Sequence, residues 1–278
     1  MRVLLSGISL AVGLYVALAP RLSKQLYRKY LFRPDPYPHD LECAPSLDGI
    51  EGKDVYFPAG SGVRLHGWVY EQPNAKRWML VSHGNAGNIV NRQELIRLLL
   101  RTGISVFIFD YQGYGRSEGT PDIPDICFDG EAAYDYLVRE KNVQPQDLIL
   151  YGESLGASVA GYLSKVRQSA GMILQSGFSS LERIAREEMP LLKIYPDFLF
   201  PQSMLNNAAV LGQPHPPVLI AHGVNDTVIN FDHALHLYDQ AVGKKILLRL
   251  PKSAHSDITV SAPGEFQAAI EEFLSGLV

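Results

Sequence analysis

Short apolar segments alternate with segments of helical periodicity over most of the chain. The short apolar segments predict strands at Asp54–Phe57, Val63–Tyr70, Trp78–Ser82, Ile104–Asp110, Leu148–Tyr151, Met172–Gln175, Val218–Ala221 and Ile246–Leu250. The helical spacing predicts helices at Asn91–Arg101, Phe128–Glu140, Leu155–Arg167, Asp232–Ala241 and Gly264–Leu277. Strands that are apolar on both faces and separated by helices indicate a mostly parallel sheet covered on both sides. The first two strands are expected to form an antiparallel pair.

The length of 278 residues is compatible with one large α/β domain and a short appendage. We place this domain at residues 51–278 and a short cap over its site at residues 177–217, a long Pro- and aromatic-rich interruption of the pattern. Residues 21–50 are basic and then Pro-rich, and they indicate a linker or strap between the domain and the N-terminal segment.

The N-terminal segment is apolar from Val3 to Ala19 and contains no charge. Its length lies at the short limit for a transmembrane helix, and we predict a membrane anchor over residues 1–20. A cleaved signal peptide and a buried helix are the alternatives. Positive charge is denser after the segment than before it, which predicts that the α/β domain of a single-pass protein lies on the cytoplasmic side.

Charge and cysteine content exclude some classes of function. The net charge of −4 gives no indication of a nucleic-acid partner. The two cysteines, Cys43 and Cys127, are too few for a disulfide framework, and no Cys/His cluster indicates a metal site. The chemistry described below needs no cofactor, and we expect none.

A candidate nucleophile lies between a predicted strand and a predicted helix, in the sequence Gly152-Glu153-Ser154-Leu155-Gly156. The pattern G-x-S-x-G is common by chance, but in a strand–turn–helix setting it is typical of a strained turn that exposes a serine. The alternative is a serine that only caps the helix. We predict that Ser154 is the nucleophile and that the N–H of Leu155 contributes to binding an oxyanion.

The second oxyanion donor is expected from the loop after the strand Trp78–Ser82. This loop reads His83-Gly84-Asn85-Ala86-Gly87-Asn88, and its glycines leave room for close approach to a reacting carbonyl. We predict that the N–H of Asn85 is the donor and that His83 has a structural role.

Five motifs together resemble α/β-hydrolases: HGNAGN, Phe109 to Ser117, GESLG, His222 to Asp226, and Ala254 to Asp257. Their order is similar to that of a membrane-anchored branch related to acyl-protein thioesterases, lysophospholipases and serine-aminopeptidase-like hydrolases. The resemblance covers roughly residues 50–278. It implies an α/β-hydrolase fold with a Ser-His-Asp triad.

Chain order in this fold is nucleophile, acid, then histidine. Among the histidines, His255 alone follows the last predicted strand by a short loop, and we predict that it is the base. Asp226 follows the strand Val218–Ala221, and the resemblance places the acid at this position. Asp110 and Asp257 are expected to anchor loops.

The motifs indicate a serine hydrolase that cleaves carboxylic ester or thioester bonds of acyl substrates through an acyl-enzyme intermediate. A membrane anchor favours lipidic or acylated substrates. Large apolar side chains of the cap can form an acyl-chain wall or pack as core: Met189, Leu191, Leu192, Ile194, Tyr195, Phe198, Phe200 and Met204. An aminopeptidase-like amide hydrolase, with Glu153, Glu187 or Glu188 binding a substrate amine, and a non-catalytic scaffold are the alternatives.

Overall fold

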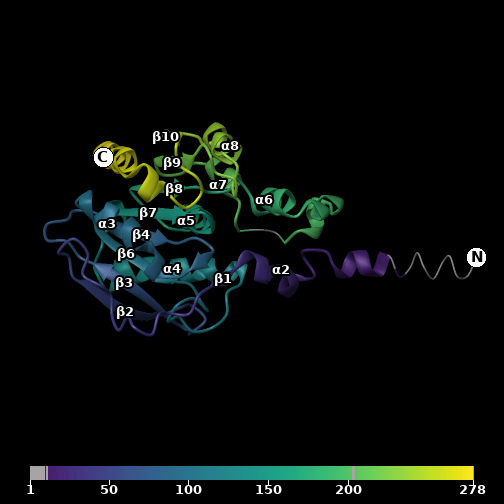
Figure 1. The fold of residues 1–278 in the computed structure, drawn as a ribbon, viewed down its shortest axis with the longest axis horizontal. Helices are drawn as coiled ribbons and strands as arrows, with labels where there is room; N and C mark the ends of the chain where they lie inside the picture. Colours follow the sequence, from purple (N-terminus) through teal and green to yellow (C-terminus); the bar gives the residue numbers. More distant parts are fainter. Residues whose placement is uncertain (1–9, 11, 202–203, 278) are drawn as a thin grey trace, which may run out of the picture.

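A computed structural model describes residues 10, 12–201 and 204–277 and arranges them around one large sheet (Figure 1). Eight strands form this sheet in the order β10-β9-β8-β7-β4-β6-β3-β2. Their bounds are β2 Gly52–Pro58, β3 Arg64–Tyr70, β4 Trp78–Ser82, β6 Ser105–Asp110, β7 Leu148–Glu153, β8 Gly171–Gln175, β9 Val218–Gly223 and β10 Lys245–Leu250. Each predicted strand is present, with ends shifted by at most two residues.

The sheet is parallel from β10 to β6, and only the β6–β3 and β3–β2 pairs are antiparallel. The expected mostly parallel sheet and its antiparallel opening pair are therefore confirmed. In such a sheet the carboxyl ends of the parallel strands lie at one edge, where the loops carry the reactive groups. Ser154, Asp226 and His255 follow three of these ends, those of β7, β9 and β10.

Helices cover both faces of the sheet and enclose one apolar core on each face. One face is covered by α4 Ile123–Arg139, α5 Leu155–Val166, α7 Asn207–Leu211 and α8 Asp232–Gln240. The other is covered by α3 Gln93–Arg101, α9 Ile258–Ser261 and α10 Pro263–Ser275. The two-sided cover explains why most strands read as continuous apolar runs.

Two predicted helices begin elsewhere than expected. The helix predicted from Phe128 begins at Ile123, because the Asp122 carboxylate accepts the N–H of Ile123 and Pro124 fits the first helical turn. The helix predicted from Asn91 is preceded by a 3₁₀ turn, Ile89–Arg92, which the side chain of Asn88 caps.

The segment before the sheet is folded against the domain. It contains α2 Lys24–Leu31 and the strand β1 Arg33–Pro34, which pairs in parallel with β5 Ala86–Gly87. We call residues 10–36 the N-terminal arm. Half of the predicted anchor, residues 1–9 and 11 of residues 1–20, lies outside the described residues. The part of the chain that the structure describes contains no helix with the length and hydropathy of a membrane span.

The predicted cap, residues 177–217, lies beside the arm (Figure 1). It contains the helix α6 Leu181–Glu188, the 3₁₀ turns Pro190–Ile194 and Asp197–Leu199, and α7. A small apolar core joins cap and arm, because Ala19 packs with Leu192, Tyr195 and Phe200.

Candidate active site

Ser154 lies in the tight turn between β7 and α5, in a backbone conformation that few non-glycine residues adopt, with φ 54° and ψ −114°. The turn tolerates no side chain at the flanking glycines. A Cβ at Gly152 would lie 2.2 Å from the carbonyl oxygen of Gly156, and one at Gly156 would lie 2.0 Å from that of Ser82. The sequence thus allows a turn that holds the serine above the end of the sheet.

The structure brings together the three residues proposed from chain order. The Nε2 of His255 lies 3.0 Å from the Oγ of Ser154, and its Nδ1 lies 2.7 Å from Oδ2 of Asp226. Because an ionised carboxylate only accepts hydrogen bonds, Nδ1–H donates to Asp226 and Nε2 is left to accept the serine proton. This is the geometry that a nucleophile, base and orienting acid require.

Asp226 is held as a carboxylate. Burial alone would raise its pKa, but the close approach of His222 and the hydrogen bond from His255 outweigh burial and hold the pKa well below its ordinary value. The N–H groups of Val228 and Ile229 also donate to Oδ1, at 2.9 and 2.8 Å. Three donors, the N–H groups of Val228 and Ile229 and Nδ1–H of His255, therefore fix the orientation of the acid.

His222 contacts Asp226, and the sequence analysis did not predict this contact. Its Nε2–H lies 3.1 Å from Oδ2 of Asp226 and 2.7 Å from the carbonyl oxygen of Ile229. The structural role expected for this histidine is consistent with these contacts, but its contact with the proposed acid was not predicted. The only available signal was the spacing of four residues between His222 and Asp226.

Asn85 and Leu155, whose N–H groups are the two proposed oxyanion donors, line the same pocket as Ser154 and His255. Within the described residues, neither N–H donates to a protein acceptor. The carbonyl of Asn85, in contrast, is fixed. It accepts from the N–H of Arg33 at 2.9 Å and from the hydroxyl of Tyr114 at 2.8 Å.

A buried ionic cluster supports the loop that carries Asn85. Oδ1 of Asp110 accepts the N–H of Ile89 at 3.0 Å and lies 3.4 Å from Nε2 of His83. Burial alone would raise the pKa of Asp110, but the neighbouring rings of His66 and His83, with nitrogens 3.7 and 3.4 Å from the carboxylate, outweigh burial and lower the pKa. Asp110 therefore anchors a loop, as predicted, and His83 is buried with a structural role. Asp257 likewise anchors a loop by accepting the N–H of Ala254.

A pocket of about 660 Å³ opens at Ser154. Its walls are mostly apolar and come from the arm, the start of α4 and the cap. Of the cap residues proposed as a wall, four line the pocket: Met189, Leu192, Phe200 and Met204. Three others point outward and are exposed, namely Leu191, Ile194 and Phe198, while Tyr195 is buried against the arm.

The three acidic residues considered for binding a substrate amine differ in their surroundings. Glu153 forms an ion pair with Arg92 at 2.6 Å. Glu187 pairs with Arg183 at 2.8 Å and with His233 at 2.7 Å, on the far side of α6. Glu188 lines the pocket, and among the described residues no ion pair to it is found.

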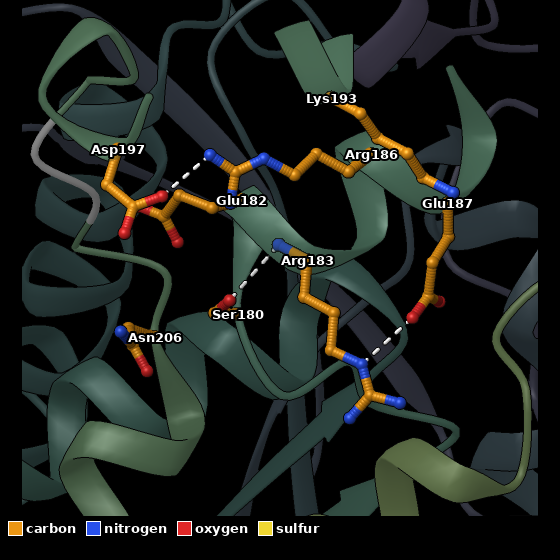
Figure 2. Close-up of a pocket in the computed structure, with 8 residues that line it drawn as sticks. All are labelled: Ser180, Glu182, Arg183, Arg186, Glu187, Lys193, Asp197 and Asn206. Atoms are coloured by element: carbon orange, nitrogen blue, oxygen red, sulfur yellow. Dashed lines mark hydrogen bonds and ion pairs between the residues drawn. The ribbon is translucent and has the colours of Figure 1, made fainter. Parts of the chain in front are cut away.

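A second pocket, of about 630 Å³, lies on the outer side of the cap and contains none of the proposed catalytic residues (Figure 2). Two ion pairs cross it, Arg183–Glu187 and Arg186–Asp197, at 2.8 and 2.6 Å. The acidic and basic side chains that line this pocket balance one another, so its charge favours neither an anionic nor a cationic ligand. Within the described residues no group of side chains that could hold a metal ion is found.

Comparison with known proteins gives consistent matches. The family model described as serine aminopeptidase, S33, matches residues 73–215, a range that includes Ser154 and Asn85 and ends before Asp226. The protein YfhR of Escherichia coli O157:H7 is 32% identical over 231 residues, which are 80% of this chain and 78% of YfhR. Human alpha/beta hydrolase domain-containing protein 17B is 32% identical over 204 residues, 73% of this chain and 68% of that protein.

Among solved structures, the esterase PF2001 of Pyrococcus furiosus superposes with a TM-score of 0.74 at 20% identity. The match covers 89% of this chain and 98% of the esterase. At this identity the likeness shows the fold, which is the α/β-hydrolase fold expected from the motifs.

Proposed function

The chain belongs to the serine aminopeptidase S33 family of α/β-hydrolases, and we propose that it cleaves carboxylic ester or thioester bonds of acyl substrates. The observation that carries the proposal is the series of contacts from Asp226 through His255 to Ser154, 2.7 and 3.0 Å long, at the bottom of an apolar pocket. The fold shared with an esterase supports the reaction class.

The proposed reaction begins when Oγ of Ser154 attacks the carbonyl carbon of the substrate and its proton passes to Nε2 of His255. The carboxylate of Asp226 stabilises the resulting imidazolium and holds the ring in place. The N–H groups of Asn85 and Leu155 donate to the oxyanion. His255 then protonates the leaving alcohol or thiol, and the acyl group remains on Ser154.

Water completes the cycle. It attacks the acyl-enzyme while Nε2 of His255 accepts one of its protons, and the same two N–H groups again bind the oxyanion. Collapse of this intermediate releases the carboxylic acid and returns the proton to Ser154. Each oxyanion donor contributes on the order of 3 kcal/mol to lowering the barrier in enzymes of this type.

The walls of the pocket favour an acyl chain over a polar substrate. Tyr27 and Leu31 of the arm face the same cavity as Ile184, Met189 and Leu192 of the cap. Burying one methylene contributes about 0.8 kcal/mol, which corresponds to about a fourfold gain in kcat/KM for each added methylene until the pocket is full. The apolar N-terminal segment is part of the same proposal, as a tether that holds the enzyme at a bilayer where acyl substrates are concentrated.

A chain-length series tests this function. The full chain in mild detergent is assayed with p-nitrophenyl esters from acetyl to palmitoyl, beside Ser154→Ala. We expect kcat/KM to rise with chain length and the variant to be inactive. Activity confined to acetyl and butyryl esters would contradict an acyl-chain site, and full activity of Ser154→Ala would contradict the mechanism.

An aminopeptidase-like amide hydrolase is the second candidate, because Glu188 lines the pocket with no ion-pair partner among the described residues and can face a substrate ammonium. Amino-acid p-nitroanilides separate the two functions. Turnover of these amides above that of the esters, lost in Glu188→Gln, would favour the peptidase. A non-catalytic scaffold would turn over neither.

A further inference from the structure

Exposed apolar side chains are concentrated on two segments of the molecule. Of the eighteen large apolar side chains that are exposed among the described residues, eleven lie on the arm or on residues 189–200, which we call the cap tip. They are Leu10, Val12, Leu14, Val16, Leu18, Leu22, Leu26, Tyr30, Leu191, Ile194 and Phe198. Scattered exposed apolar residues are normal, whereas a concentration of this kind marks an interaction surface.

The arm and the cap tip form one surface because they are bonded to each other. The ring of Tyr15 stacks on Tyr195 with 4.7 Å between centroids, and its hydroxyl donates to the carbonyl of Ile194 at 2.9 Å. The N–H of Arg21 donates to the carbonyl of Leu199 at 2.8 Å. Figure 1 shows both segments projecting from the same side of the domain.

The charge of the arm fits a particular partner. The arm contains five cationic side chains and one acidic side chain, Asp35 near its end, although the whole chain has a net charge of −4. The cations are Arg21, Lys24, Arg28, Lys29 and Arg33. Exposed apolar side chains flanked by cations are the combination that binds the interface of an anionic membrane.

The same two segments form the wall of the active-site pocket on their inner side. Tyr27 and Leu31 of the arm and Met189 and Leu192 of the cap tip line the cavity that opens at Ser154. An acyl chain in a bilayer that contacts the outer side of the arm and the cap tip therefore lies next to the pocket. Such a chain can enter the pocket with little exposure to water. Exposing the chain to water would cost about 0.8 kcal/mol for each methylene.

We propose that the arm and the cap tip together form a docking surface for an anionic lipid bilayer, with the cap tip inserted at the boundary between headgroups and acyl chains. This proposal differs from tethering by the N-terminal segment, because the cap tip, a part of the folded domain, enters the membrane. Since Tyr15 contacts Ile194 and Tyr195, a membrane that contacts the segment around Tyr15 also contacts the cap tip. Interfacial helices lie roughly 5–10 Å into the headgroup region, and we expect the cap tip to insert to a similar depth.

Fluorescence quenching by lipid tests the insertion without any turnover. Leu191 is 82% exposed and accepts a tryptophan, while the native Trp68 and Trp78 are 0% and 8% exposed. We expect Leu191→Trp in the full chain to shift to the blue on vesicles of phosphatidylcholine and phosphatidylglycerol, and to be quenched at least twofold by brominated acyl chains. The matched control is Tyr56→Trp, on β2.

The control should show neither change. If Leu191→Trp stays unquenched while the protein sediments with the vesicles, the N-terminal segment binds alone and the proposal is overturned. Equal quenching of both variants, or no sedimentation with the vesicles, overturns it as well. Because quenching requires no reaction, these results do not depend on the proposed hydrolase activity.

A second set of variants measures the effect on turnover. Leu191→Gln, Ile194→Gln and Phe198→Gln change only exposed side chains that do not line the pocket. We expect the triple variant to hydrolyse acetyl esters in solution as before and a long-chain ester embedded in vesicles at least tenfold more slowly. A triple control on other exposed positions, Val166→Gln, Val242→Gln and Val260→Gln, should change neither rate. Equal rates of both triple variants on vesicles overturn the proposal.

Discussion

The hydrogen bonds that fix the carbonyl of Asn85 provide a sharp test of the proposed oxyanion site. The N–H of Arg33 and the hydroxyl of Tyr114 both donate to this carbonyl, at 2.9 and 2.8 Å. Arg33→Pro removes the first donor, and Pro is compatible with the first residue of a short strand. Tyr114→Phe removes the second. Arg33→Ala is the matched control, because it removes the charge and retains the N–H.

The magnitude follows from the loss of hydrogen bonds. Each of the two hydrogen bonds contributes about 1 kcal/mol. If this free energy is lost from the positioning of the Asn85 N–H in the transition state, each single variant should lower kcat about fivefold. The double variant leaves the carbonyl without either donor, at a cost of about 1–3 kcal/mol. Complete loss of one oxyanion donor lowers kcat about 10²–10³-fold and sets the upper limit.

The assay is steady-state hydrolysis of a short-chain ester, with kcat and KM determined separately and folding checked by circular dichroism. A positioning role predicts that kcat falls in the order of lost hydrogen bonds, while Arg33→Ala keeps the wild-type kcat. Because the side chain of Arg33 lines the pocket, the KM of Arg33→Ala is the baseline for the KM of Arg33→Pro. An unchanged kcat in the folded double variant would refute the assignment of Asn85. A change confined to KM would show that the arm only shapes the pocket.

Three further predictions concern single residues. Asp226→Asn should lower kcat about 10³–10⁴-fold in the ester assay, because the histidine loses its orienting acid; a loss below tenfold would contradict this. Gly156→Ala should destabilise the protein by about 3 kcal/mol or more in denaturant unfolding, because its Cβ would lie 2.0 Å from the Ser82 carbonyl oxygen, whereas Gly264→Ala, in open space, should not. Burial raises the pKa of Asp129 to about 7. Its contribution to stability should therefore be complete below about pH 4 and fall by up to about 4 kcal/mol as pH rises to 7, and Asp129→Asn should flatten that profile in unfolding measurements.

The parts of the site that lie in strand–loop motifs could be predicted from the sequence. Ser154 is proposed because its turn needs two glycines between a strand and a helix, and His255 because it alone among the histidines follows the last predicted strand by a short loop. In the structure Nε2 of His255 lies 3.0 Å from Oγ of Ser154, and the catalytic roles of the two residues stay a prediction. Such local patterns are visible in a sequence because the turn or strand end that positions the residue is adjacent to it.

The parts that depend on distant backbone contacts could not be predicted. The sequence of residues 21–50 predicts a linker or strap. In the structure, however, the arm pairs with the loop that carries Asn85, through the N–H of Arg33 and the carbonyl of Asn85. Neither side chain takes part in this contact, so no pattern of residue types reveals it. The sequence also did not show which cap side chains face the pocket. Leu192 lines the pocket, whereas its neighbour Leu191 is exposed. Both lie in a short 3₁₀ turn, so no α-helical periodicity indicated which of them is buried.

The proposed mechanism requires Ser154 to be a nucleophile activated by His255, and covalent trapping tests this requirement. The full chain is treated with a fluorophosphonate, and its mass and tryptic peptides are then measured. We expect one adduct, on Ser154, that forms at least a hundredfold more slowly in His255→Ala and is absent in Ser154→Ala. An adduct on another residue, or no adduct in the folded wild-type protein, would contradict it.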